Sequence, residues 1–166
     1  DIRSVVPPTL ASFNGFIYMA YQTATNGKVW MTRFEPATKS WYAPFALSFT
    51  SAGAPGMVAY KGKLFLVGST PSNGQIFYTT MDTLERFSAV NAITDDFGRY
   101  APSVAAADFG IVMVHREAGT DKLVYNMYDS WNSNSGWGFP RAISEGLGGD
   151  AQQHTPINPT IATYGG

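Results

Sequence analysis

Amide-bearing, charged and aromatic residues stand in the short segments that separate the apolar runs of this chain. Amides, guanidiniums and carboxylates supply the fixed donors and acceptors that a hydroxyl-rich ligand needs, and aromatic rings supply the flat faces on which its C–H groups stack. The candidate ligand-binding residues are Gln22, Asn26, Asn73, Arg99, Tyr100, Arg116, Glu117, Trp131 and His154. Three further rings could stack on a ligand in the same way, namely Trp30, Trp41 and Trp137. Together these residue types favour binding of a polar, partly apolar ligand, with glycans as the expected partners.

Patterns typical of a catalytic or metal-binding site are weaker in this sequence than the pattern of ligand-binding residues. Arg99, Arg116 and Glu117 could meet Asp96 near one pocket, but the six arginines of the chain do not recur at matching positions. A glycosidase needs two carboxyl groups at a set separation, which no spacing here specifies. The histidines His115 and His154 lack the spacing of a metal site, and cysteine is absent. The sequence therefore favours binding over catalysis and predicts no cofactor and no metal.

Composition excludes two further classes of partner. The 166 residues include eleven Lys plus Arg against twelve Asp plus Glu, a formal net charge of −1, so no general field attracts nucleic acid. No apolar run approaches the roughly 20 residues of a membrane span. The start of the chain has no basic segment followed by an apolar one, so a signal is either absent or removed. Secretion or the cell surface is slightly favoured.

An internal repeat organises the whole chain. Similar segments open at Pro8, Pro55 and Pro102 at intervals of 47 residues, and a fourth opens at Pro159 after 57 residues. Insertions over 132–136 and 144–158 account for the longer interval. A repeat of this length is a supersecondary unit that buries its apolar faces by stacking on its neighbours.

Each repeat divides into four strand-length runs separated by Gly, Asn, Pro or Ser, which favour turns. The expected strands are 9–14, 16–22, 28–34 and 41–47, then 57–60, 63–68, 75–81 and 87–93, then 103–107, 111–116, 122–128 and 137–143. No helix is expected.

The second strand of every repeat is apolar on both faces, as in 16–21, 64–67 and 111–114. A sheet with one wet face would alternate apolar and polar residues, so these strands are expected to be covered on both sides. We therefore predict an all-β chain, a β-propeller built from four-stranded antiparallel blades. One repeat domain over 1–166 would hold about three blades, 8–54, 55–101 and 102–158, plus an extra strand over 159–164. The alternative is a single β-sandwich of about twelve strands.

The repeat resembles the sialidase-type or lectin-type β-propellers of bacteria and fungi. The resemblance rests on the proline-led first strand, the Asn-Gly turn at Asn26-Gly27 and Asn73-Gly74, and the closing Trp of the segments 34–41 and 130–137. Those two segments are similar to an Asp box but lack its Asp and Gly. The resemblance implies that the loops after the second strands and between blades share one ligand-binding face. Trp131 would lie on the opposite face.

Three blades do not close a ring, because propellers have typically four to eight. We expect a homodimer that completes a six-bladed ring, or a chain that is a piece of a longer protein. The leading functional hypothesis is a lectin with repeated shallow sites, one between each pair of blades, on a propeller assembled from more than one chain. A protein-interaction scaffold and a fragment of a sialidase-like glycoside hydrolase remain alternatives.

Overall fold

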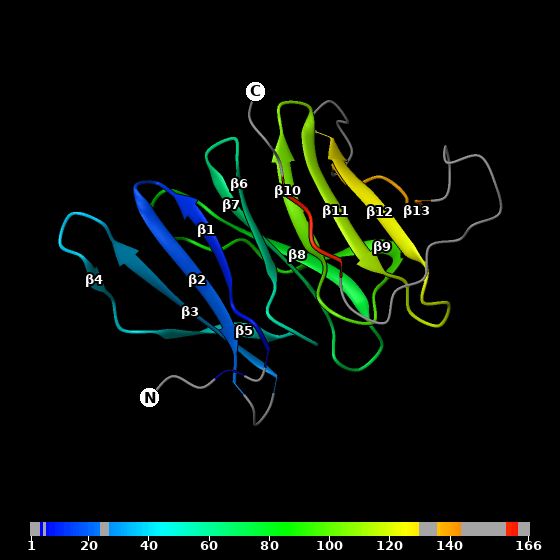
Figure 1. The fold of residues 1–166 in the computed structure, drawn as a ribbon, viewed down its shortest axis with the longest axis horizontal. Coiled ribbons are helices and arrows are strands. Elements are labelled where there is room, and N and C mark those ends of the chain that lie inside the picture. The colour runs from blue at the N-terminus through cyan, green and yellow to red at the C-terminus, as the bar shows by residue number, and fades with distance from the viewer. Residues whose placement is uncertain (1–3, 5, 24–26, 130–135, 144–158, 163–166) are drawn as a thin grey trace.

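The computed structural model describes residues 4, 6–23, 27–129, 136–143 and 159–162. Within these residues the chain is all-β and contains no helix, and the strands form three antiparallel sheets that fan out from β1, β6 and β10 (Figure 1). In this part of the chain there is accordingly no helix long and apolar enough to cross a membrane. The all-β, four-stranded, antiparallel units predicted from the sequence are confirmed.

The first sheet contains β1 (Thr9–Phe13), β2 (Phe16–Gln22), β3 (Lys28–Glu35), β4 (Ser40–Trp41) and β5 (Phe45–Thr50). β1, β2 and β3 form successive hairpins. The short β4 pairs with the last residues of β3, and β5 pairs with the first part of β3, so these two strands share the fourth position of the sheet.

The other two sheets have simpler four-strand orders. The second contains β6 (Gly56–Tyr60), β7 (Lys63–Ser69), β8 (Gln75–Met81) and β9 (Asn91–Phe97). The third contains β10 (Ser103–Ala107), β11 (Gly110–Arg116), β12 (Leu123–Asp129) and β13 (Arg141–Ala142). The second strands β2, β7 and β11 end at Gln22, Ser69 and Arg116, which stand 47 residues apart as the repeat requires.

The fourth strand of each sheet begins later than predicted. The rings expected to start it, Trp41, Phe87 and Trp137, instead make short pairings with the ends of the third strands. Proline stands three residues after two of them, at Pro44 and Pro140, and removes a backbone donor there. The ordered fourth strand therefore resumes several residues downstream, at β5, β9 and β13.

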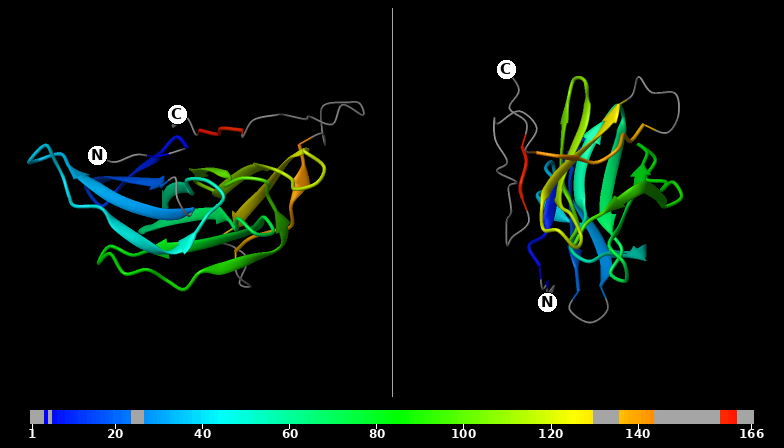
Figure 2. Two further views of the ribbon diagram at one scale, coloured as in Figure 1. Left: turned by 90° about the horizontal axis from the view of Figure 1, so that it is seen from below. Right: turned by 90° about the vertical axis from the view of Figure 1, so that its right-hand side faces the viewer.

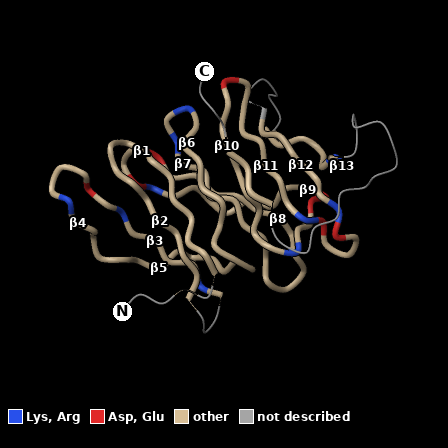
Figure 3. Tube along the Cα trace, viewed as in Figure 1, with Lys and Arg blue, Asp and Glu red and all other residues tan. Residues whose placement is uncertain are grey.

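Two apolar layers hold the sheets together. One lies between the first and second sheets and includes Tyr18, Met31, Leu64 and Leu66; the other lies between the second and third sheets and includes Val67 and Ile111. The second sheet is therefore covered on both faces, which explains why β7 is apolar throughout. Charged residues lie mainly in the connections between strands (Figure 3).

Residues 159–162 run beside the first strand of the third sheet (Figure 2, red). The backbone N–H of Ile161 donates to the hydroxyl of Ser103 at 3.2 Å. No strand is assigned over 159–162, and the rest of the predicted extra strand, 163–164, lies outside the described residues.

Candidate functional site

Neighbouring sheets meet at two equivalent junctions. At the first junction, β5 of the first sheet packs against the second sheet, and at the second junction, β9 packs against the third sheet. The same backbone bond joins the connecting segment to the next second strand at both places: Ala52 N–H donates to Ser69 O, and Arg99 N–H donates to Arg116 O. Each junction carries a hollow on the outer side, formed between the fourth strand of one sheet and the next sheet.

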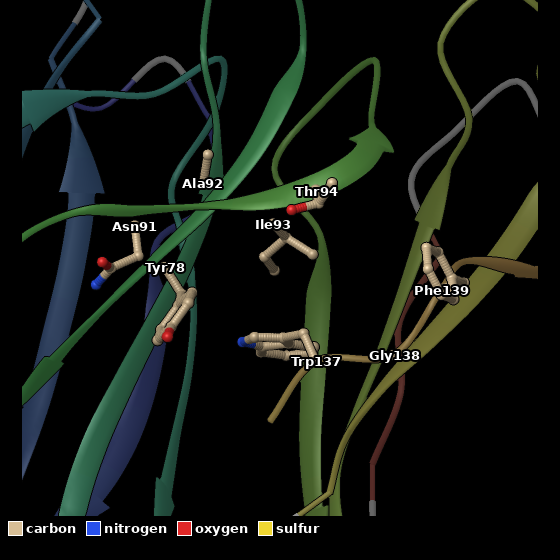
Figure 4. Close-up of a pocket in the computed structure, with 8 residues that line it drawn as sticks. All are labelled: Tyr78, Asn91, Ala92, Ile93, Thr94, Trp137, Gly138 and Phe139. Atoms are coloured by element: carbon tan, nitrogen blue, oxygen red, sulfur yellow. The ribbon is translucent and has the colours of Figure 1, made fainter. Parts of the chain in front are cut away.

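The large hollow lies at the second junction and has a volume of about 620 Å³. Its lining residues are Tyr78, Asn91, Ala92, Ile93, Thr94, Trp137, Gly138 and Phe139. Figure 4 shows the rings of Tyr78 and Trp137 facing one space beneath β9. Their ring centroids are 6.0 Å apart, and Phe139 at the rim is 75% exposed.

Polar groups stand beside these rings. Asn91 and Thr94 lie on β9 at the wall of the large hollow (Figure 4). The buried indole N–H of Trp137 finds no acceptor among the described residues, although a buried indole normally has one. Burial raises the pKa of the Tyr78 hydroxyl, and the neighbouring Tyr128 raises it further, so Tyr78 is a neutral donor at physiological pH. The hollow thus combines aromatic faces with amide, hydroxyl and indole groups.

The small hollow is the counterpart at the first junction, with a volume of about 240 Å³. Its lining residues are Phe45, Ala46, Leu47, Ser48, Phe49, Thr79, Phe87, Ser88 and Val90. Phe87 occupies the position that Trp137 holds in the next repeat, because Phe87 pairs with Met81 and Trp137 pairs with Tyr128, and these partners stand 47 residues apart near the ends of their third strands. One wall comes from a fourth strand in both hollows. The two hollows are therefore one structural feature repeated.

A charged cluster, Arg99, Arg116 and Asp121, lies on another part of the second junction. The guanidinium Nη2 of Arg116 is 2.5 Å from Asp121 Oδ2, and Nη1 of Arg99 is 3.2 Å from Asp121 Oδ1. The hydrogen bond from Arg116, with a further one from Arg99, holds the pKa of the Asp121 carboxyl below its usual value. Conversely, Asp121 raises the pKa of Arg99. Two guanidinium groups therefore share one carboxylate here.

Beneath the charged cluster lies a buried polar cluster, Asp96, His115 and Asn126, each about 1% exposed. Asn126 Nδ2 donates to Asp96 Oδ2 at 2.9 Å. His115 Nε2 is 2.7 Å from Asp96 Oδ1, a close polar contact without the alignment of a good hydrogen bond. Oδ1 of Asn126 accepts the backbone N–H of Met127, which fixes the amide orientation. The buried cluster joins β9 to β11 and β12.

The structure brings together four of the residues selected from the sequence. Arg99, Tyr100, Arg116 and Glu117 meet at the second junction, with Glu117 accepting a bond from the Thr120 hydroxyl. Tyr100 also borders an axial cavity of about 530 Å³ between the starts of the repeats.

The other predicted residues are placed differently. Gln22 is buried at the first junction, where its amide donates to Ser51 O. The side-chain oxygen of Asn73 accepts the backbone N–H of Gln75 and stabilises its own turn. Asn26, Trp131 and His154 lie outside the described residues. Among the described residues, no group of three or more metal-binding side chains is present.

Sequence reasoning missed Asp121 and most of the large hollow. Asp121 stands where the first two repeats have Gly27 and Gly74, and all three residues have positive φ. An Asp that replaces a recurring turn glycine was therefore a detectable signal, because Asp tolerates this conformation better than most residues. No comparable signal marked the other lining residues Asn91, Thr94 and Phe139, because the fourth strands β9 and β13 begin four residues later than the sequence predicted.

Comparison with known proteins gives a fold-level match. No protein-family model matches the chain, and no curated protein matches it in sequence. Among solved structures, it is similar to one described as NanB plus Optactamide, with a TM-score of 0.52 and 18% identity. It is also similar to the NanB sialidase from Streptococcus pneumoniae in complex with 2-[(3-chlorobenzyl)ammonio]ethanesulfonate, with a TM-score of 0.51 and 18% identity. Each match covers 76% of this chain and 22% of the other, so the chain spans about a fifth of the length of these structures.

Proposed function

We propose that this chain is a three-blade portion of a β-propeller that binds carbohydrate in the hollows between neighbouring blades. The observation that carries the proposal is the repetition of the hollow at both junctions, each with an aromatic ring at the same repeat position. Repeated shallow sites are what a lectin uses to gain avidity from several weak contacts.

The large hollow has the chemistry that a sugar requires. Its volume of about 620 Å³ falls within the range of small-molecule sites. Rings of Tyr78 and Phe139 offer apolar faces for C–H groups, and Asn91 and Thr94 offer side chains that both donate and accept hydrogen bonds. Glycans match both the apolar rings and the polar side chains of this surface, because a sugar carries C–H faces as well as hydroxyl groups.

The test uses a ring whose removal leaves the fold intact. Phe139→Ala removes an exposed ring at the rim of the large hollow. The lost ring contact of about 1 kcal/mol should weaken binding about fivefold. Binding is located on a glycan array and then measured by calorimetric titration with the best-bound free oligosaccharide.

Phe109→Ala is the matched control, because Phe109 is 53% exposed in the β10–β11 turn and lines neither hollow. Its affinity should equal that of the wild type. Thr94→Ala tests the polar wall in the same titration. Failure of the chain to bind any glycan would reject the proposal, as would equal losses for Phe139→Ala and Phe109→Ala.

A second candidate is a portion of a sialidase-like glycoside hydrolase. The charged cluster beside Tyr100 and the axial cavity favours it, because guanidinium groups such as those of Arg99 and Arg116 suit the carboxylate of an acidic sugar. The similarity in fold to a sialidase agrees with this candidate without deciding it. Hydrolysis of a fluorogenic sialoside by the chain, lost in Glu117→Gln, would favour this candidate over the lectin.

A further inference from the structure

One face of the first sheet has no other sheet packed on it among the described residues. It is mostly apolar, and the buried Thr32 and Tyr21 lie on the same side. By strand register, Leu10 and Met19 stand opposite each other on this face, as do Ile17 and Phe34. Trp30 lies on the same side, opposite Tyr21. Leu10 is 59% exposed and Ile17 is 37% exposed. We call the surface formed by Leu10, Ile17, Met19, Trp30 and Phe34 the open face.

The corresponding face is buried in the other two sheets. In the second sheet the repeat places Met57, Leu64 and Leu66 at the positions of Leu10, Ile17 and Met19, and these three are at most 6% exposed. They pack against the first sheet in its apolar layer. In the third sheet the same positions hold Val104, Ile111 and Met113, which pack against the second sheet. Two copies of this face out of three therefore dock on a preceding sheet.

The opposite face of each sheet does the covering. Phe13, Tyr18, Ala20 and Met31 of the first sheet cover the second. The positions equivalent to this covering face in the third sheet include Ala105, Val112 and Tyr125, and the register puts Val112 on the side away from Ile111 and Met113. The two ends of the three-sheet stack therefore carry complementary surfaces. The first sheet presents the open face, and the third sheet presents the kind of face that covers it in the other two layers.

We propose that a second copy of this chain docks head to tail, with the covering face of its third sheet against the open face of the first. A second copy fits this surface because both apolar layers within the chain are made by the same pair of faces. Two copies related by a rotation that joins both ends would close a ring of six sheets, within the range found for propellers.

Docking also requires a rearrangement at the third sheet. The strands β1, β6 and β10 stand side by side. Residues 159–162 lie next to β10, and Ile161 lines the same cavities as Leu10 of the open face. An incoming β1 would take that place. Residues 159–162 must therefore move aside, and a chain ending at residue 158 should associate more tightly than the full chain.

The docked copy would complete a third hollow between sheets. That this hollow binds carbohydrate rests on the proposed function. Trp41 stands at the repeat position of Phe87 and Trp137, pairs with Phe34, and is 51% exposed. The missing wall would be the fourth strand of the partner. Association is measured without sugar, so a failure to bind glycan and a failure to associate are distinguishable.

The experiment is sedimentation velocity on the full chain over a range of concentrations. The wild type should sediment with twice the chain mass of 18.0 kDa. Leu10→Glu should weaken association at least a hundredfold and give the single-chain mass, because it would bury an unpaired carboxylate in the interface. Leu84→Glu is the matched control, since Leu84 is 68% exposed in the turn before β9 and lies outside the open face. It should sediment as the wild type does.

Mixing two defective chains tests the head-to-tail geometry. Val112→Glu should disable the covering face of the third sheet and also give the single-chain mass. A mixture of Leu10→Glu and Val112→Glu retains one intact pair of faces, so it should recover mixed dimers, whereas each variant alone should not. A wild type of single-chain mass up to ~100 µM, well above the micromolar range of a modest interface, would overturn the proposal. A mixture that stays monomeric would overturn it as well.

Discussion

At the first junction the ring of Phe49 lies 5.1 Å from the ring of Phe77, and Gly68 leaves room for that ring. At the second junction the repeat puts Asp96 in place of Phe49 and His115 in place of Gly68. One backbone arrangement is therefore filled by an aromatic pair in one copy and by a buried polar cluster in the other. The backbone is similar at both junctions, because the equivalent bonds from Ala52 N–H to Ser69 O and from Arg99 N–H to Arg116 O hold the connecting segments in the same way.

The difference shows which features the repeat conserves. It keeps the strand ends, the junction bonds and the hollow outside each junction, whereas the side chains between the sheets vary as a set. Asp96 accepts from Asn126 and contacts His115, so changing any one member leaves the others buried without their partner. The aromatic filling of the first junction has no such mutual dependence.

The largest effect is expected from Asp96→Ala. This change leaves the amide of Asn126 buried without its acceptor and removes the carboxylate that contacts the buried imidazole of His115. Loss of one member of a buried polar or ionic set costs about 3 kcal/mol of unfolding free energy. Urea unfolding followed by circular dichroism gives the free energy. A loss below about 0.5 kcal/mol, the usual scatter of neutral surface changes, would mean that the cluster is not coupled.

Replacing the whole set sharpens the same test. The chain with Asp96→Phe, His115→Gly, Val124→Phe and Asn126→Thr carries the filling of the first junction, as in Phe49, Gly68, Phe77 and Thr79. It should be more stable than Asp96→Ala and close to the wild type, because well-packed apolar groups often replace buried charges at no cost. If it is less stable than the single variant, the two junctions are not interchangeable.

A smaller effect is expected from Gly68→Ala at the first junction. A Cβ at residue 68 would lie 2.7 Å from the Phe77 ring and 2.9 Å from the Ser51 hydroxyl. Overpacking of this kind costs about 2 kcal/mol, measured by the same urea unfolding. Gly53→Ala is the control, since its Cβ would meet Ala101 Cβ at an ordinary 3.5 Å. Equal stability of both variants would show that the Phe77 ring moves freely.

The sheets could be predicted from the sequence because their signals are local and repeated. The 47-residue spacing and the apolar second strands placed β2, β7 and β11 to within a residue or two. The fourth strands could not be placed, because Trp41, Phe87 and Trp137 looked like strand starts but serve as isolated pairing points. Their register depends on tertiary packing against the neighbouring sheet, which no local pattern encodes.

The candidate sites could be predicted only in part for the same reason. Arg99 lies in the connection from β9 to β10, whereas Arg116 and Glu117 lie at the end of β11; their charged types made them candidates, and the second junction brings them together. The large hollow was missed because its wall is β9, a shifted strand. Gln22 has the composition of a binding residue, yet its burial beside Ser51 follows from the stacking of two sheets.

The smallest effect is expected from Asp121→Asn in the charged cluster, and pH reveals it. The pKa of the Asp121 carboxyl is lower in the folded chain, through its hydrogen bond with Arg116, than in the unfolded chain. Its contribution to stability is therefore present above the ordinary Asp pKa of about 3.9 and is lost as the pH falls below that value. At pH 7 the variant should unfold at slightly lower urea concentration than the wild type, and this difference should be smaller at pH 3. Asp82, whose carboxyl pKa is also lowered by Arg86, is present in both proteins and cancels in the comparison. Asn adopts the positive φ of residue 121 as readily as Asp does, so the substitution leaves the turn intact and isolates the charge. A difference that is unchanged at pH 3 would show that Asp121 does not act through its charge.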